Sequence, residues 1–342
     1  MDSLIEDALK DLFGQLTKPS QNTVTSKEQR DAIADEIQAG GFTDLLLPQE
    51  AAGTGITLFE AIPLLKLEGF YNLPVPFAQT VVTRAWAHRH NIALPEGMTG
   101  YAAIASKPDA RRRSATLHKA WYGDWAHMLV VNGNECYLAS SGTAQVQYQY
   151  EGNLFAAISW PDESLERLEV GQQAAAELSR LCIFSMAATI VGAMEKAFEM
   201  TVEYAGERKQ FGRPVSKFQA VQHQISEMSE HVCAAGMALQ MAGETGSAVL
   251  AAPAAEPLAI AQYQIAHISD RIADIAHAVH GAIGISQDYP LHHYTRRIRE
   301  CKSCYGSSHY WAALIGDRIL NRHQDTLLSA LTQAQPGRQP HQ

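Results

Sequence analysis

The run Arg208-Lys209-Gln210-Phe211-Gly212-Arg213-Pro214-Val215 lies between two segments of helical character. A helix is predicted to end near Tyr204-Ala205-Gly206, and Ser216-Lys217-Phe218-Gln219 reads as the start of the next one. The run combines the backbone donors of a loop with three cationic side chains, those of Arg208, Lys209 and Arg213. Such a combination suits a diphosphate or another multivalent anion.

An ordinary turn between two helices accounts for the same residues. In that interpretation Gly212 and Pro214 shape the turn, Phe211 fills the core, and Ser216 forms a capping box with Gln219. Basic side chains at a helix C-terminus also complement the helix dipole. On residue chemistry alone, the ordinary turn is the favoured interpretation.

Outward from this run, the sequence divides into three regions. Helical patterns broken by the Pro- and Gly-containing loop 47–55 extend to about Arg89, and short β-like runs follow, with Asn132-Gly133-Asn134 as a predicted hairpin turn. Helical periodicity then returns, with an apolar and small-residue face that should let helices approach closely. That face consists of Leu178, Leu181, Ser185, Ala188 and Gly192.

The pattern predicts a mainly α fold with a small β insert. We expect an N-terminal helical domain over 1–99, a short β-strand middle domain over 100–171, and a C-terminal four-helix bundle over 172–331. The tail 332–342 lacks apolar periodicity and is expected to be disordered.

Three stretches resemble the acyl-CoA dehydrogenase family, and together they cover nearly the whole chain. The first is the run described above with its flanks, the second is a glycine turn followed by an acidic-Tyr-Pro segment, and the third lies in the N-terminal region. They comprise Tyr204, Arg208, Gln210-Phe211-Gly212, Pro214-Val215, Phe218-Gln219 and Val221-Gln222; Gly281 to Leu291 with Arg296; and Gly41-Phe42, 47–55, Glu68 and Pro74-Val75-Pro76.

The resemblance implies a tetramer that binds FAD at subunit interfaces. In the family a Glu removes the α-proton of an acyl-CoA while the flavin takes the β-hydride, so base and flavin must both be in place. By position, seven residues of this chain are expected to reach FAD: Arg208, Gln210, Phe211, Gln219, His280, Gly281 and Ala282. The capping role of Gln219 stays open as an alternative.

The chain departs from the family where the reaction would occur. Tyr305 stands at the position of the usual base, and Cys182 at the position of an alternative base. Neither residue is a carboxylate, a phenol with a pKa near 10 is a poor base, and an apolar surrounding disfavours a thiolate. The β segment is too short for the family's flavin-holding parts, and Ala278 and Ala282 replace the usual Gln and second Gly.

These departures lead to the hypothesis of a reduced subunit in a heterotetrameric acyl-CoA dehydrogenase. A full-length homologue would complete an α₂β₂ assembly and supply the catalytic Glu, while this chain contributes to the interface FAD site. The resemblance further implies a bulky steroid side-chain CoA ester as substrate and an electron-transfer flavoprotein or similar acceptor. A flavin-free structural subunit with the same fold and an independent enzyme with a relocated base are the alternatives.

Composition limits the classes of partner and compartment. The formal charge of −9 and pI near 5.9 argue against a general nucleic-acid surface. The uncharged run 181–194 is too short for a membrane span of about 20 residues. The N-terminus lacks the pattern of a secretory signal, and five sparse cysteines are typical of a reducing compartment, so we expect a cytoplasmic protein.

Two further clusters are expected to have no ligand role. His277 and His280 follow Asp270 and Asp274 on one predicted helix, but one helix supplies too few convergent ligands for a metal. The basic run 111–113 is interpreted as a solvated turn, with contact to CoA phosphates as the alternative.

Overall fold

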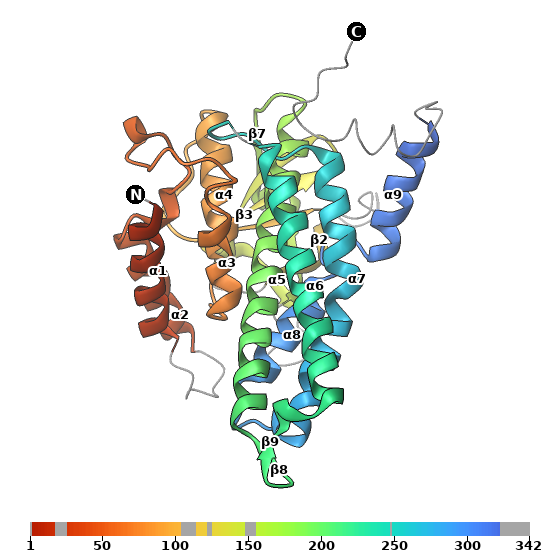
Figure 1. Ribbon diagram of the computed structural model, residues 1–342. Coiled ribbons are helices and arrows are strands. Elements are labelled where there is room, and N and C mark those ends of the chain that lie inside the picture. The colour runs from red at the N-terminus through yellow and green to blue at the C-terminus, as the bar shows by residue number, and fades with distance from the viewer. Residues whose placement is uncertain are drawn as a thin grey trace.

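The computed structural model describes residues 2–17, 26–103, 114–121, 125–147, 155–246 and 248–321. Three long helices, α5, α6 and α7, run side by side, with the N-terminal helices on one flank and the strands behind them (Figure 1). The predicted tail 332–342 and the basic run 111–113 lie outside the described residues.

The N-terminal region is helical, as predicted. It contains α1 (Asp2–Leu16), α2 (Lys27–Ala39), α3 (Ile62–Phe70) and α4 (Phe77–Arg89). Two short 3₁₀ turns, η1 (Phe42–Asp44) and η2 (Gln49–Ala51), occupy the connection between α2 and α3. The predicted break between helices at 47–55 is therefore confirmed.

The β segment forms two small sheets. One has the order β1 (Thr99–Ala103), β3 (His127–Asn132), β4 (Glu135–Ser140), β7 (Leu165–Leu168); the other has the order β2 (Ser114–Trp121), β6 (Phe155–Pro161), β5 (Gln145–Gln147). The β1–β3 pair is parallel and the other pairs are antiparallel. The hairpin predicted at 132–134 is confirmed, with Gly133 at φ 61° in its turn.

The first sheet separates two hydrophobic cores. Because successive side chains of a strand point to opposite faces, Leu129 and Val131 join the large core under the helices. Met128 and Val130 join a second, smaller core with Ile158 and other residues of the β segment. The two faces of this one sheet therefore contribute to the two hydrophobic cores.

The C-terminal region begins with α5 (Ala174–Glu207), whose predicted face from Leu178 to Gly192 is buried. A hairpin of β8 (Lys209–Gln210) and β9 (Arg213–Pro214) and the turn η5 (Val215–Lys217) lead to α6 (Gln219–Glu244). Then follow α7 (Ala255–His280), η6 (Gly281–Ile285), α8 (Leu291–Cys301) and α9 (Ser308–Asn321).

The closest helix approach joins α3 to α5. A Cβ added to Gly192 would lie 1.9 Å from the Lys66 carbonyl oxygen, and one added to Gly69 would lie 1.8 Å from that of Thr189. Such distances leave room for hydrogen only. Small residues do permit a close approach, but the Gly192 partner is an N-terminal helix rather than a neighbour in the C-terminal bundle.

A buried pair, Glu68 and Arg297, ties the N-terminal helices to α8. The Glu68 carboxylate accepts from the Ala78 N–H at 2.6 Å, and its Oε1 lies 3.9 Å from the Arg297 guanidinium. Arg297 donates to the carbonyls of Leu73 and Glu68. Burial raises the pKa of the Glu68 carboxyl to about 7.

Among the described residues, α5 alone is long and apolar enough to pass as a membrane-spanning helix. Its most apolar window is 78% buried inside this fold. Burial of that extent is typical of a core helix that packs against protein on most sides.

Candidate functional site

The β8–β9 hairpin projects from one end of the long helices (Figure 1). Lys209 pairs with Pro214 and Gln210 with Arg213, which leaves Phe211 and Gly212 in the turn. These two residues have φ values of 49° and 80°, and two consecutive positive φ angles are the requirement of a type I′ turn. Gly tolerates this conformation readily, whereas an aromatic residue is strained in it.

Phe211 is 92% exposed, so the expectation that it fills the core in an ordinary turn is wrong. Its ring lies 6.2 Å from that of Phe218, centroid to centroid, in a T-shaped arrangement, while the Arg213 guanidinium lies 4.3 Å from the Phe218 ring. A strained, exposed aromatic residue at a hairpin tip is costly for an isolated chain. Contact with another molecule would bury the Phe211 ring and offset this cost.

Arg208 lies at the base of this hairpin, and Gln210 directly precedes its turn. Both are exposed, and within the described residues neither side chain has a hydrogen bond or an ion pair. The Arg208 backbone is fixed, because its N–H donates to the Tyr204 carbonyl at 2.9 Å and its carbonyl accepts from Val215 at 2.8 Å. The backbone that carries the side chain is therefore held in place, and the guanidinium remains available to an external anion.

Gln219 is the first residue of α6 and is exposed. The capping box predicted with Ser216 is wrong: the N-cap residue is Phe218, and no side chain caps this helix end. The 3₁₀ turn 215–217 places Ser216 before the helix start, where its carbonyl accepts from the Gln222 side chain at 3.0 Å. The capping alternative for Gln219 is thereby removed.

The second predicted stretch lies at the same end of the molecule as the hairpin. The imidazole of His280 stacks on the Tyr204 ring, with centroids 4.5 Å apart and an interplanar angle of 22°. Tyr204 lies one helical turn before Arg208, so this stack brings the turn at 280–282 beside the C-terminal end of α5.

The His280 side chain points inward rather than outward. Its Nδ1 donates to the Ala276 carbonyl at 2.7 Å, and its Nε2 lies 3.3 Å from the Tyr289 hydroxyl. Burial lowers the pKa of His280, which favours the neutral ring. Gly281, at φ 64°, and Ala282 are exposed, and a Cβ on Gly281 would meet nothing within 4 Å. A ligand could therefore approach this backbone closely.

The position expected for the base is a polar cluster in which Gln79 and Tyr101 are buried and Tyr305 is partly buried. The Tyr305 hydroxyl accepts a hydrogen bond from the Gln79 side-chain amide at 2.7 Å, and its ring lies 5.5 Å from that of Tyr101. The Tyr101 hydroxyl in turn donates to Ser179 Oγ at 2.9 Å. Sequence reasoning identified Tyr305 but missed Gln79 and Tyr101, which are distant from it in the chain.

Burial makes both substitutes for the base harder to ionise. It raises the pKa of the Tyr305 phenol and of the Cys182 thiol well above their ordinary values. Cys182 is fully buried on α5. Neither group can act as a carboxylate does near neutral pH.

The acidic residues considered for a metal have other partners. Asp274 accepts from Arg299 at 2.6 Å, and Asp270 pairs with Lys302. Within the described ranges no three His, Cys, Asp or Glu side chains converge as a metal site.

The C-terminal half matches a known family model. Residues 172–320 match the model described as "Acyl-CoA dehydrogenase, C-terminal domain". The acyl-CoA dehydrogenase FadE28 of Mycobacterium tuberculosis is 24% identical over 329 residues, which span 87% of this chain and 95% of that protein.

Two solved structures have the same overall fold. The ChsE4–ChsE5 complex from Mycobacterium tuberculosis gives a TM-score of 0.75 at 20% identity, covering 93% of this chain and 98% of that chain. The Tcur3481–Tcur3483 steroid ACAD G363A variant gives 0.73 at 20% identity, covering 94% and 99%. The predicted mainly α fold with small β sheets and a C-terminal helical domain is confirmed.

Proposed function

This chain belongs to the acyl-CoA dehydrogenase family, whose members are oxidoreductases acting on CH–CH bonds, and from this premise we propose that it is a subunit without its own base. It would assemble with a full-length homologue as α₂β₂ and contribute to an interface FAD site. The partner's Glu would abstract the α-proton of the acyl-CoA.

The main support for the proposal is the environment of Tyr305, which stands at the position predicted for the base. Tyr305 is hydrogen-bonded to Gln79 and packed on Tyr101, so side chains of this chain occupy the space around it. A general base must lie within hydrogen-bond reach of the substrate proton and ionise near the working pH. The pKa of the partly buried Tyr305 phenol is raised by desolvation, so it meets the second requirement poorly.

Members of the family typically bind FAD, which accepts the β-hydride when it is bound. Arg208 and Gln210 fit such a ligand, because their exposed side chains have no partner among the described residues. Arg208 would neutralise pyrophosphate charge by charge-assisted hydrogen bonds. The backbone at Gly281 and Ala282 would allow close approach of the dinucleotide.

Two further residues have supporting roles in the proposal. Phe211 would pack beside the cofactor bound to a neighbouring subunit, which would cover its exposed ring. Gln219 would lie near the adenosine half of the cofactor. His280 would act through its position, since its buried ring holds the turn that presents Gly281.

The substrate proposal follows the relatives. Similarity to the Tcur3481–Tcur3483 steroid ACAD supports a bulky steroid side-chain CoA ester. An electron-transfer flavoprotein or similar acceptor would reoxidise the flavin. A flavin-free structural subunit is the rival proposal, and it predicts that the exposed Arg208 side chain has no effect on flavin content.

Co-expression with a full-length homologue tests the proposal. We expect a yellow α₂β₂ complex with two FAD per tetramer, whereas this chain alone should be colourless. Exchange of the partner's Glu for Gln should abolish dehydrogenation while leaving the flavin in place. A stable homotetramer of this chain with one flavin per subunit would contradict the proposal.

A further inference from the structure

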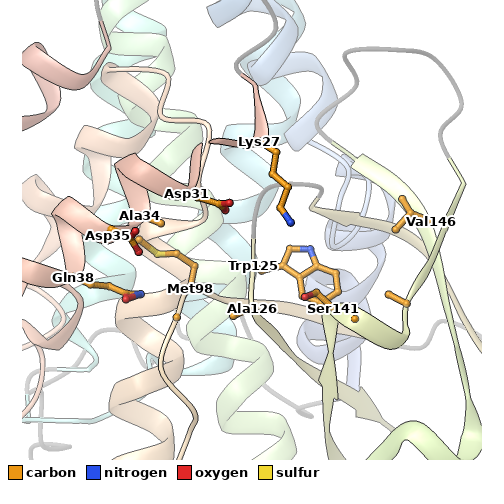
Figure 2. Close-up of a pocket in the computed structure, with 13 residues that line it drawn as sticks. Lys27, Asp31, Ala34, Asp35, Gln38, Met98, Trp125, Ala126, Ser141 and Val146 are labelled. Atoms are coloured by element: carbon orange, nitrogen blue, oxygen red, sulfur yellow. The ribbon is translucent and has the colours of Figure 1, made fainter. Parts of the chain in front are cut away.

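A cavity of about 620 Å³ lies between α2 and the β segment, on residues that the proposed flavin site does not use. Asp31 and Asp35 of α2 line one side, and Trp125 and Ser141 line the other (Figure 2). The volume falls within the range of pockets that hold small organic molecules.

The charges that line this cavity are not neutralised by neighbours. Lys27, Asp31 and Asp35 follow one another at four-residue spacing, which places them on one face of α2. All three are exposed, and none forms an ion pair or side-chain hydrogen bond within the described residues. Two carboxylates against one ammonium leave this face with an excess negative charge.

Trp125 is the buried polar group that faces the same space. The residue is 5% exposed, and its ring is held from behind by Trp160, with centroids 5.9 Å apart. In the described part of the chain its indole Nε1 has no acceptor. Figure 2 shows the nitrogen edge of the indole turned toward the cavity, on the side where Lys27 lies.

We propose that this cavity binds a small organic ammonium compound that carries a hydrogen-bond acceptor such as a carboxylate. The ammonium would lie beside the carboxylates of Asp31 and Asp35, where charge attraction favours it. The acceptor group would take hydrogen bonds from Trp125 Nε1 and the Lys27 ammonium. The rigid indole is in place before binding, which lowers the ordering cost.

Isothermal titration of the full chain with trimethylglycine tests the proposal. We expect a dissociation constant of about 1 mM or tighter. Tetramethylammonium and acetate each reproduce one end of the probe, so each should bind at least tenfold more weakly. Absence of heat and of chemical-shift change with trimethylglycine at tens of millimolar would overturn the proposal.

Variants on exposed positions of α2 locate the binding. Asp31→Asn combined with Asp35→Asn should weaken trimethylglycine at least tenfold, and Lys27→Ala should weaken it less while abolishing the advantage over tetramethylammonium. Glu36→Gln, on the same helix but outside the cavity lining, is the matched control and should bind as the parent does. Equal binding by the double variant would contradict the site.

The same titration on the α₂β₂ complex separates a ligand site from a partner contact. Unchanged affinity in the complex supports a small-molecule site. Loss of binding in the complex would mean that the partner chain occupies the cavity, and would overturn the proposal. Neither outcome depends on flavin content, so the proposed function is tested separately.

Discussion

The side-chain amide of Gln79 donates to the Tyr305 hydroxyl at 2.7 Å, a contact between residues 226 positions apart. Gln79 lies in the first turn of α4, and Tyr305 lies in the turn between α8 and α9. The bond therefore connects the N-terminal helices to the C-terminal region at the position predicted for the base. A group used as a structural bond in this way should not be needed for proton transfer.

Tyr305→Phe and Cys182→Ala should each leave turnover of the complex within a few-fold of the parent. Loss of a true general base typically costs about 10²–10⁴-fold. Tyr305→Phe leaves the Gln79 amide without its acceptor, so a stability loss of about 1–3 kcal/mol is expected. Steady-state rates at full flavin content, with gel filtration as the assembly control, separate the two effects. A thousandfold loss of rate in an intact complex would place the base on this chain.

Arg208→Ala should weaken flavin retention in the complex at least tenfold. A charge-assisted hydrogen bond to pyrophosphate is worth about 1.5–3 kcal/mol, and alanine removes it. Lys217→Ala, an exposed cation at the same end of the molecule, is the control. Flavin content after serial dilution measures the effect, and equal retention by both variants would refute the role of Arg208.

Phe211→Asn should act in opposite directions on the free chain and on the complex. Asparagine tolerates a positive φ, and Asn-Gly is a preferred type I′ pair, so the free chain should gain about 1 kcal/mol. In the complex the lost aromatic contact should weaken assembly or flavin retention. Denaturant unfolding measures the stability of the free chain, and analytical ultracentrifugation measures assembly of the complex. A destabilised free chain would show that Phe211 already has its stabilising contacts within this subunit.

Gly192→Ala should destabilise the protein by about 3 kcal/mol or more. The new methyl would overlap the Lys66 carbonyl at 1.9 Å and force α3 away from α5, which exceeds ordinary overpacking. Gly206→Ala, in the same helix with open space at its Cβ, should be neutral or stabilising by up to about 1 kcal/mol. The melting temperatures of the two variants, measured by thermal unfolding, give the comparison. Equal melting temperatures would mean that the helices can separate without cost.

The contribution of Glu68 to stability should fall as pH rises from about 4.5 to about 7. Glu68 has an ordinary pKa of 4.5 and a pKa of about 7 in the fold, so the folded chain binds more protons than the unfolded chain across this window. Glu68→Gln should flatten this part of the profile, whereas Glu230→Gln, exposed on α6, should not. Glu68→Ala should cost about 3–5 kcal/mol, because it removes the carboxylate beside the buried Arg297 guanidinium. Urea unfolding at several pH values gives the slope.

Periodicity and turn chemistry predicted the architecture well. Two features depend on residues close in sequence and could be predicted from the sequence alone. They are the buried face of α5 from Leu178 to Gly192 and the turn at Gly133. The parallel β1–β3 pair and the α3–α5 contact depend on residues far apart. No local sequence pattern specifies against which distant helix Gly192 packs.

The candidate site was predicted less completely. The exposure of Phe211 and the true cap of α6 follow from a 3₁₀ turn at 215–217 that the sequence pattern does not distinguish from a helix start. Arg297 was passed over in favour of its neighbour Arg296, and only the tertiary fold shows which of the two is buried. The contribution of each site residue to flavin binding stays a prediction.

The sheet that separates the two hydrophobic cores has a consequence for how the molecule opens. Its helix-facing side, including Leu129 and Val131, is part of the large core, whereas its other side, including Met128 and Val130, packs with Ile158 and Trp160. We therefore expect the second sheet, of β2, β5 and β6, to open before the first sheet, one side of which belongs to the large core. Amide exchange should distinguish two cooperative units, with β6 exchanging well before β3, and the helical unit should outlast truncation of the outer sheet.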